Sequence, residues 1–242
     1  MNDQLIINRI EKFLGYGNLK SDIWLIGIEE GFKGDENIDK RLEYSYNKEV
    51  IDILEMKTSD HLQWFIQNAH IQATYKYLIR TLLLKFENKS NPDKEYVRNY
   101  QINRLGRLSG NHALLELLPL PNKSKNSWEW DKLSTLPELQ TREAYTRIIT
   151  PKRIELINKK IRIFQPAIVI YYCGFFPYKP YLEQIYGTLK EIKDPTFGNE
   201  IILHTKYMST NIFLTRFPLY SGRGIWDCMS KKMIEISNKK SG

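Results

Sequence analysis

The chain has 242 residues, of which 42% are hydrophobic and 26% charged, and this balance indicates an ordinary globular protein with one well-covered core. Its net charge of +8 favours an anionic partner, and nucleic acid is the commonest such partner for a basic chain with 12% aromatic residues. The sequence shows neither a signal segment nor an apolar run that could span a bilayer, so we expect a cytoplasmic protein with no membrane partner. We also expect a single domain over residues 1–242 and a monomer.

Cysteine and histidine positions favour neither a disulfide framework nor a metal centre. Cys173 and Cys228 lie in different segments, and the four histidines do not have zinc-ligand spacings. Cys173 ends an apolar run, which is typical of a buried structural thiol. We therefore expect no metal and no cofactor.

The first half of the chain predicts helices that alternate with buried strands. Apolar residues with helical spacing predict a short helix over residues 5–14, which Gly15 and Gly17 would end. Residues 22–27 are an apolar run that ends at a glycine, as expected for a buried strand. The elements that follow are a polar loop at 33–47, a helix at 59–86, a break at 88–93, and a second buried strand at 113–118 that two prolines end.

The second half of the chain continues this alternation. The expected elements are a basic loop with two tryptophans at 121–136, a helix at 137–164 that Pro151 could interrupt, a third strand at 167–173, a helix near 178–190, strands at 200–203 and 211–215, and a last helix at 224–238. Strands that alternate with helices favour a mostly parallel sheet covered on both faces. We therefore expect an α/β protein with a three-layer α/β/α architecture.

The segment from Gly27 to Phe32 places two carboxylates, Glu29 and Glu30, between two glycines directly after the first predicted strand. Sheets of this class bind ligands just beyond the carboxyl ends of their strands. Glycines at a strand end also mark ordinary turns, and in that interpretation both acids are solvated turn residues. Two further loops, at 116–121 and 215–224, follow predicted strands, and the three loops can converge on one cleft.

The third of these loops combines two arginines, Arg216 and Arg223, with Phe217, Leu219 and Tyr220 around Pro218. Arginines hold phosphates, and an apolar side chain on a rigid turn can enter a base stack and fill the gap that an extruded nucleotide leaves. The alternative is a surface loop with ordinary aromatic packing.

Taken together, these segments resemble the uracil-DNA glycosylase superfamily, and the resemblance spans roughly residues 20–230. Members have a Gly-x-(Asp/Asn)-Pro-Gly or Gly-Glu-x-Pro-Gly loop, a middle strand with a polar residue that reads the base, and a late His-Pro-Ser-Pro-Leu-Ser type loop. The matching segments here are 27–31, 114–121 and 215–220, and residues 165–174 are similar to the superfamily's Pro-x-hydrophobic strand-Gly segment.

The chain departs from the superfamily pattern at three positions. Glu29 stands where members have Asp or Asn, Glu30 replaces the loop proline, and Thr215 or Arg216 stands in place of the histidine. The resemblance implies a glycosylase that acts on an extruded base in duplex DNA. Glu29 would orient and deprotonate the attacking water and stabilise the sugar cation, and Glu30 would share that role or hold Glu29 in place.

Glu116 occupies the position of the base-reading residue. A carboxyl group accepts a hydrogen bond from N4 of cytosine and, when protonated, donates one to N3, whereas an ionised carboxylate repels O4 of uracil. We therefore expect a modified cytosine, such as a substituted 5-hydroxymethylcytosine of phage DNA, and a role in phage defence. In another strand register Glu116 would face solvent or pair with a lysine.

The remaining candidates complete the expected site. For base binding they are Phe32, Tyr44 and Tyr46, by stacking, with Asn111 as a second base reader; for DNA binding they are Arg216, Phe217, Pro218, Leu219, Tyr220, Arg223, Lys123 and Lys125. Other interpretations of the chain are a glycosylase for uracil or another deaminated base, an inactive DNA-binding module of the same fold, and an enzyme that acts on free nucleosides.

Overall fold

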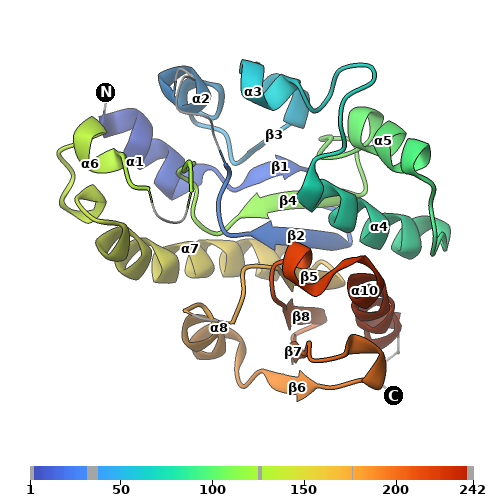
Figure 1. Cartoon of the computed structure of the whole chain (residues 1–242). Helices are drawn as coiled ribbons and strands as arrows, with labels where there is room; N and C mark the ends of the chain where they lie inside the picture. Colours follow the sequence, from blue (N-terminus) through green and yellow to red (C-terminus); the bar gives the residue numbers. More distant parts are fainter. Residues whose placement is uncertain (1–2, 32–37, 125–126, 176, 239–242) are drawn as a thin grey trace.

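The computed structural model describes residues 3–31, 38–124, 127–175 and 177–238. Within these residues the strands are β1 (Gly15–Gly17), β2 (Ile23–Gly27), β3 (Val50–Ile51), β4 (His112–Glu116), β5 (Ile168–Tyr171), β6 (Lys190–Ile192), β7 (Ile202–Tyr207) and β8 (Thr210–Leu214). They form one eight-stranded sheet in the order β3-β1-β4-β2-β5-β8-β7-β6 (Figure 1).

The helices lie around this sheet. They are α1 (Asp3–Lys12), α2 (Ile38–Tyr44), α3 (Ser59–Leu62), α4 (Ala73–Glu87), α5 (Lys94–Asn103), α6 (Trp130–Leu133), α7 (Arg142–Phe164), α8 (Lys179–Tyr186), α9 (Pro218–Ser221) and α10 (Arg223–Asn238), with 3-10 turns η1 (Ile53–Glu55), η2 (Pro137–Leu139) and η3 (Pro195–Phe197). No helix in the described residues is both long and apolar enough to cross a membrane.

The centre of the sheet is parallel. Strands β4, β2, β5 and β8 run in the same direction, and β3 is parallel to β1. Antiparallel pairing is confined to β1 with β4 and to β6, β7 and β8 at the other edge. In the register of β2 and β4, Gly27 lies beside Glu116, so both strands end at the same level.

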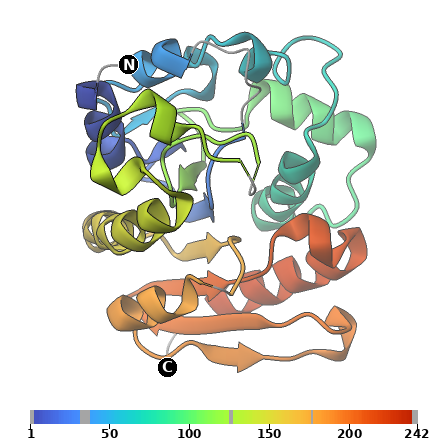
Figure 2. The same cartoon turned by 60° about the vertical axis from the view of Figure 1, so that its left-hand side comes forward.

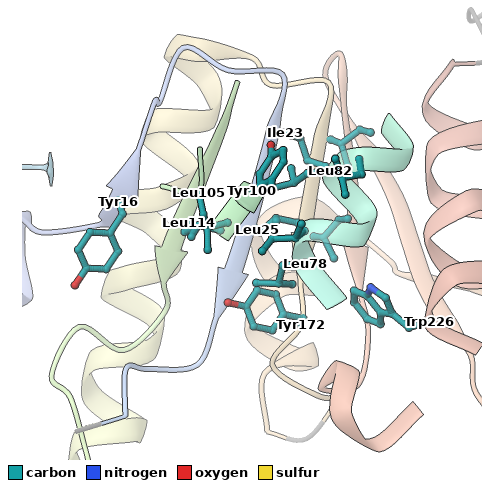
Figure 3. Packing of buried hydrophobic residues seen from close by; sticks show 14 of the residues in the cluster. Tyr16, Ile23, Leu25, Leu78, Leu82, Tyr100, Leu105, Leu114, Tyr172 and Trp226 are labelled. Carbon is teal, nitrogen blue, oxygen red and sulfur yellow. The ribbon is translucent and has the colours of Figure 1, made fainter. Parts of the chain in front are cut away.

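Alternate side chains of the strands enter two separate cores. Ile23 and Leu25 of β2 pack with buried residues of α4, α5 and α10 on one face of the sheet (Figure 3). Trp24 and Ile26 pack on the opposite face with residues of α7 and α8. Because each face of the sheet is covered by helices, the expected three-layer α/β/α architecture is confirmed.

A third cluster closes the end of the sheet near the carboxyl terminus of β4. It joins residues of α1 and α2 to the residues after β4 and to the first turns of α7. Figure 2 shows how these elements lie beside one another in the fold. Ile6 and Trp130 are fully or almost fully buried in this cluster.

Several boundaries differ from those that the sequence predicts. The helix predicted over 59–86 is interrupted, because Asn68 adopts a left-handed φ of 64° and α4 starts only after Gln72, whose side chain caps the backbone N–H of Tyr75 at 2.7 Å. Residues 15–17 form β1 instead of merely ending a helix. A Cβ atom at Gly15 would lie 2.2 Å from the carbonyl oxygen of Leu114, so only glycine permits this close pairing of β1 with β4.

Other elements lie where the sequence predicts a loop or another type of structure. The polar stretch 33–47 contains α2, the loop 215–224 contains α9, and Lys190 belongs to edge strand β6 rather than to the preceding helix. Helix α7 begins at Arg142 after an N-cap by Thr141, and it continues through Pro151. Helix α5 has no counterpart among the predicted elements.

Candidate active site at the carboxyl ends of β2 and β4

A cleft of about 750 Å³ opens where β2 and β4 end. Each of the three segments predicted to converge contributes to it: residues 27–31 at and after the end of β2, Glu116 as the last residue of β4, and Phe217 and Tyr220 after β8. Of the loop predicted over 116–121 only Glu116 lines the cleft, and residues 122–124 beyond it line the cleft as well. The other walls come from the segment between α3 and α4, from the start of α7, and from residues around the end of β5 and the start of α8. This volume is typical of cavities that hold small organic ligands.

The loops after β2 and β4 run side by side beyond the ends of their strands. The amide of Leu117 donates to the carbonyl oxygen of Gly27 at 2.9 Å, that of Leu118 to Ile28 at 2.7 Å, and that of Asn122 to Glu30 at 2.9 Å. These bonds continue the parallel pairing, so the backbone that carries Glu29 and Glu30 is fixed to the backbone that follows Glu116.

Glu30 is held from three directions. Its Oε2 atom lies 2.9 Å from the Arg9 guanidinium and 3.4 Å from that of Arg41, and Tyr16 donates a hydrogen bond to Oε1. Burial on its own raises the pKa of Glu30, but Arg41, Arg9, His61 and the Tyr16 hydroxyl together hold that pKa below its usual value. Glu30 is therefore an ionised anchor between the sheet and the first two helices.

Glu29 faces the first turn of α7. Its Oε2 atom lies 2.6 Å from Nη1 of Arg142, and Nη2 of Arg142 donates to Oε1 at 2.8 Å. Trp128 lies against the same guanidinium, with its ring centre 5.4 Å away. This two-point pairing with a planar guanidinium fixes the orientation of the Glu29 carboxylate at the edge of the cleft.

Glu116 differs from both of these acids. It makes no ion pair among the described residues, and its Oε2 atom is enclosed without a hydrogen-bond partner. Burial, followed by the negative charges of Glu30 and Glu29, raises the pKa of Glu116 well above its usual value. The cleft therefore holds one neutral carboxyl group beside two ion-paired carboxylates.

Gly27 makes room for this carboxyl group. A Cβ atom at residue 27 would lie 2.7 Å from the Tyr172 hydroxyl oxygen and 3.0 Å from Oε2 of Glu116. Burial raises the pKa of the Tyr172 hydroxyl, which therefore stays neutral. Any residue with a side chain at position 27 would displace one of these two groups.

Aromatic residues line the walls of the cleft, and among the described residues they do not include Tyr44 or Tyr46, which were predicted to stack on a base. They are Trp64, Tyr75, Tyr172, Tyr178, Phe217 and Tyr220. Among them, Tyr172 contacts Phe217 and Phe217 contacts Tyr220, each pair with ring centres 6.0 Å apart. Flat aromatic surfaces of this kind suit a planar heterocycle.

The predicted base-binding residues are only partly brought together. Tyr44 packs against the core on the α4 face, and Tyr46 lies in the turn after α2 with its side chain 42% exposed, so neither lines the cleft. Asn111 precedes β4 and accepts a hydrogen bond from Tyr100 at 3.4 Å. It is separated from Glu116 by the length of the strand, about 16 Å, and it does not line the cleft. Phe32 lies outside the described residues.

The predicted DNA-binding loop is a short helical turn at the rim of the cleft. Phe217 and Tyr220 line the cleft, Pro218 is buried as the first residue of α9, and the exposed fractions of Leu219 and Tyr220 are 43% and 67%. Outside the lining, Arg216 pairs with Glu200 at 3.2 Å and Arg223 is exposed at the start of α10.

The predicted basic contacts after β4 are divided between described and undescribed residues. Lys123 lines the cleft and pairs with Glu129 at 2.7 Å. Lys125 lies outside the described residues.

Sequence reasoning missed the arginines that hold the acids. Arg9 lies three residues after Ile6 and four before Phe13, so it belongs to the buried face of α1. A basic residue on an apolar helix face is a signal for a buried acidic partner, and this signal could have identified Arg9. Arg153 has the same signature in α7, where it donates to the carbonyl oxygens of four residues: Ile10, Phe13, Glu116 and Leu117.

Comparisons with known proteins do not identify a family for this chain. No protein-family model matches the sequence, and no curated protein matches it. The case for a function therefore depends on the geometry of the cleft.

Proposed function

We propose that this protein is a DNA glycosylase that hydrolyses the N-glycosidic bond of a flipped, modified cytosine and leaves an abasic site. The observation that carries the proposal is the cleft at the ends of β2 and β4. It presents the Arg142-paired Glu29 and the neutral Glu116 on neighbouring loops, with aromatic walls around them. The loose resemblance of the same loops to the uracil-DNA glycosylase superfamily supports the same reaction.

Glu29 is the group that activates water in this proposal. Cleavage of an N-glycosidic bond passes through a sugar with oxocarbenium character, which a nearby carboxylate stabilises while it accepts a proton from the attacking water. Arg142 keeps the Glu29 carboxylate in one orientation through two contacts. Glu30 has its own anchoring contacts with Arg9, Arg41 and Tyr16, so we assign it a positioning role rather than catalysis.

Glu116 reads the base. Its neutral carboxyl group donates one hydrogen bond and accepts another, which matches N3 and the N4 amino group of cytosine. The base is proposed to stack against the aromatic walls, and a volume of about 750 Å³ accommodates a substituent at its 5-position. A modified base is the safer substrate for a cell, because excision of ordinary cytosine would destroy its own genome.

Excision of uracil is a second candidate, because a neutral Glu116 is compatible with this base too. An ionised carboxylate would repel O4 of uracil, but a neutral carboxyl group can donate to O4 and accept from N3–H. The hydrogen-bonding groups of Glu116 therefore fit both bases, and the assay below distinguishes them.

The test measures base release from duplexes that contain uracil, hypoxanthine, 5-hydroxymethylcytosine or glucosylated 5-hydroxymethylcytosine. Mass spectrometry identifies the free base, and alkaline cleavage of the strand reports the abasic site. We expect release from a cytosine-derived substrate and a loss of about 100-fold or more in rate for Glu29→Gln. The matched control, Glu235→Gln on the exposed face of α10, should retain the wild-type rate.

Two results would count against this function. Salt-sensitive DNA binding without release of any base would favour a DNA-binding module, and release from free nucleosides alone would favour a nucleoside hydrolase. Equal rates for wild type and Glu29→Gln would remove Glu29 from the mechanism.

A further inference from the structure

The proposed reaction leaves negative charge on the departing base, and the cleft must neutralise it. When the bond between N1 and C1′ breaks, its electron pair stays on N1 of the base. Among the described residues that line the cleft, the arginines and the lysine are already engaged with carboxylates, since Arg41 pairs with Glu30, Arg142 with Glu29 and Lys123 with Glu129. A proton supplied to the base would neutralise this charge directly.

Glu116 is placed to supply that proton. It lines the cleft, and its enclosed Oε2 atom has no hydrogen-bond partner. The neighbouring strand contributes Gly27 at this level, so on that side no side chain of β2 covers the carboxyl group, and the neutral Tyr172 hydroxyl lies beside the same space. An acid whose pKa is raised by burial and by neighbouring carboxylates, and whose enclosed oxygen has no hydrogen-bond partner, is a suitable general acid.

We propose that Glu116 is the general acid of this reaction as well as the reader of the base, an inference that rests on the proposed function. As the bond between N1 and C1′ breaks, the proton on the Glu116 carboxyl group moves to N3 of the cytosine. The electron pair of the broken bond goes to N1, so the base departs as a neutral, N3-protonated tautomer.

The remaining atoms of the reaction are accounted for by water. Its oxygen adds to C1′, and one of its protons passes to the Glu29 carboxylate. After one turnover Glu116 is ionised and Glu29 is protonated. Transfer of that proton through solvent restores both groups for the next turnover.

The charges around Glu116 determine the pH range of this acid. Glu30 and Glu29 disfavour its ionised form, whereas Arg9 and Arg153 favour it; the latter donates to the Glu116 carbonyl oxygen at 3.0 Å. The titratable groups that face it from the neighbouring elements are Glu29 and Glu30 after β2, Arg9 of α1, Tyr75 of α4, Arg153 of α7 and Tyr172 after β5.

The experiment compares single-turnover rates of wild type, Glu116→Gln and Glu235→Gln on two duplexes, one with 5-hydroxymethylcytosine and one with 5-formylcytosine. The formyl group withdraws electrons and makes the base a better leaving group, so it depends less on protonation. We expect Glu116→Gln, which retains a donor and an acceptor, to bind both duplexes with nearly wild-type affinity. Its rate should fall by about 100-fold or more on the first duplex and by much less on the second.

A pH profile supplies the second measurement. The wild-type rate should fall as alkaline pH removes the Glu116 proton, whereas the rate of Glu116→Gln should show no such alkaline limb. Equal rate losses on both duplexes, or a loss confined to binding, would overturn the general-acid role and leave the glycosylase intact. Absence of base release by the wild type from every duplex tested would instead overturn the proposed function and this inference together.

Discussion

At the scale of single residues, three glutamates with the same side chain occupy three different electrostatic environments. Glu30 is ionised between two arginines, Glu29 is paired with one, and Glu116 is neutral. Separation of acid and base roles by environment is the usual way in which one site carries out both halves of a hydrolysis. The identity of a residue therefore does not reveal its role until its partners are known.

Replacement of Glu30 tests its assignment as an anchor. Glu30→Gln leaves the buried Arg9 guanidinium without its ionic partner, so we expect the free energy of unfolding to fall by about 3 kcal/mol. Because the pKa of Glu30 is lowered on folding, its contribution is present at neutral pH and is lost as pH falls through the folded-state pKa. In urea denaturation, the free energy of unfolding of Glu30→Gln should thus be lower than that of the wild type at pH 7, and this difference should shrink at acidic pH. A stable Glu30→Gln protein without activity would instead make Glu30 catalytic.

Glu116 has the opposite linkage. Its pKa is raised on folding, so the native state retains a proton that the unfolded chain releases, and stability falls as pH rises above the unfolded-state value. Relative to Glu116→Gln, the wild type should lose up to about 1.4 kcal/mol of stability per pH unit between the two pKa values. Thermal unfolding of both proteins from pH 5 to pH 9 measures this difference. Parallel curves would show that Glu116 ionises normally.

At the scale of elements, the parts that depend on local pattern were predictable. Apolar runs located β2, β4, β5 and β8, and the alternation with helices gave the layers, because burial on both faces leaves a continuous apolar signal. Short elements such as β1, β3 and α9 were not predicted, because they are stabilised by contacts with segments that are distant in the sequence rather than by a local pattern. Trp64 and Tyr75 line the cleft, but the sequence did not predict this, because the helix expected over 59–86 is interrupted between these two residues.

The turn α9 gives a prediction at this scale. Leu219 and Tyr220 project from a short helix whose first residue is a buried proline, beside the mouth of the cleft. If they enter the base stack, Leu219→Ala with Tyr220→Ala should slow base release from a fully paired duplex by about 10-fold or more. Release from single-stranded DNA should change little, since unstacking costs a few kcal/mol only in the duplex. Equal losses on both substrates would contradict a role in base extrusion.

At the scale of the whole molecule, the net charge of +8 should mainly affect the proposed affinity for DNA. Each phosphate neutralised by a lysine or arginine contributes about 0.9 to the slope of log affinity against log salt concentration. We expect a linear plot with a slope of several units for duplex DNA, and a slope smaller by about one after Arg223→Gln. Fluorescence anisotropy between low and physiological salt makes this measurement. Affinity that does not change with salt would rule out phosphate contacts as its source.

The arginines that pair with Glu29 and Glu30 also determine how much of the protein's net charge lies in the cleft. Arg9, Arg41 and Arg142 come from three helices and offset Glu29 and Glu30, so with Glu116 neutral these five ionised side chains sum to a single positive charge. Nearly all of the net positive charge, which would attract DNA in the proposed function, therefore lies in other parts of the protein. If the proposed function is correct, surface substitutions should change the affinity for DNA without altering the charges of the cleft, so that affinity and catalytic rate can be engineered separately.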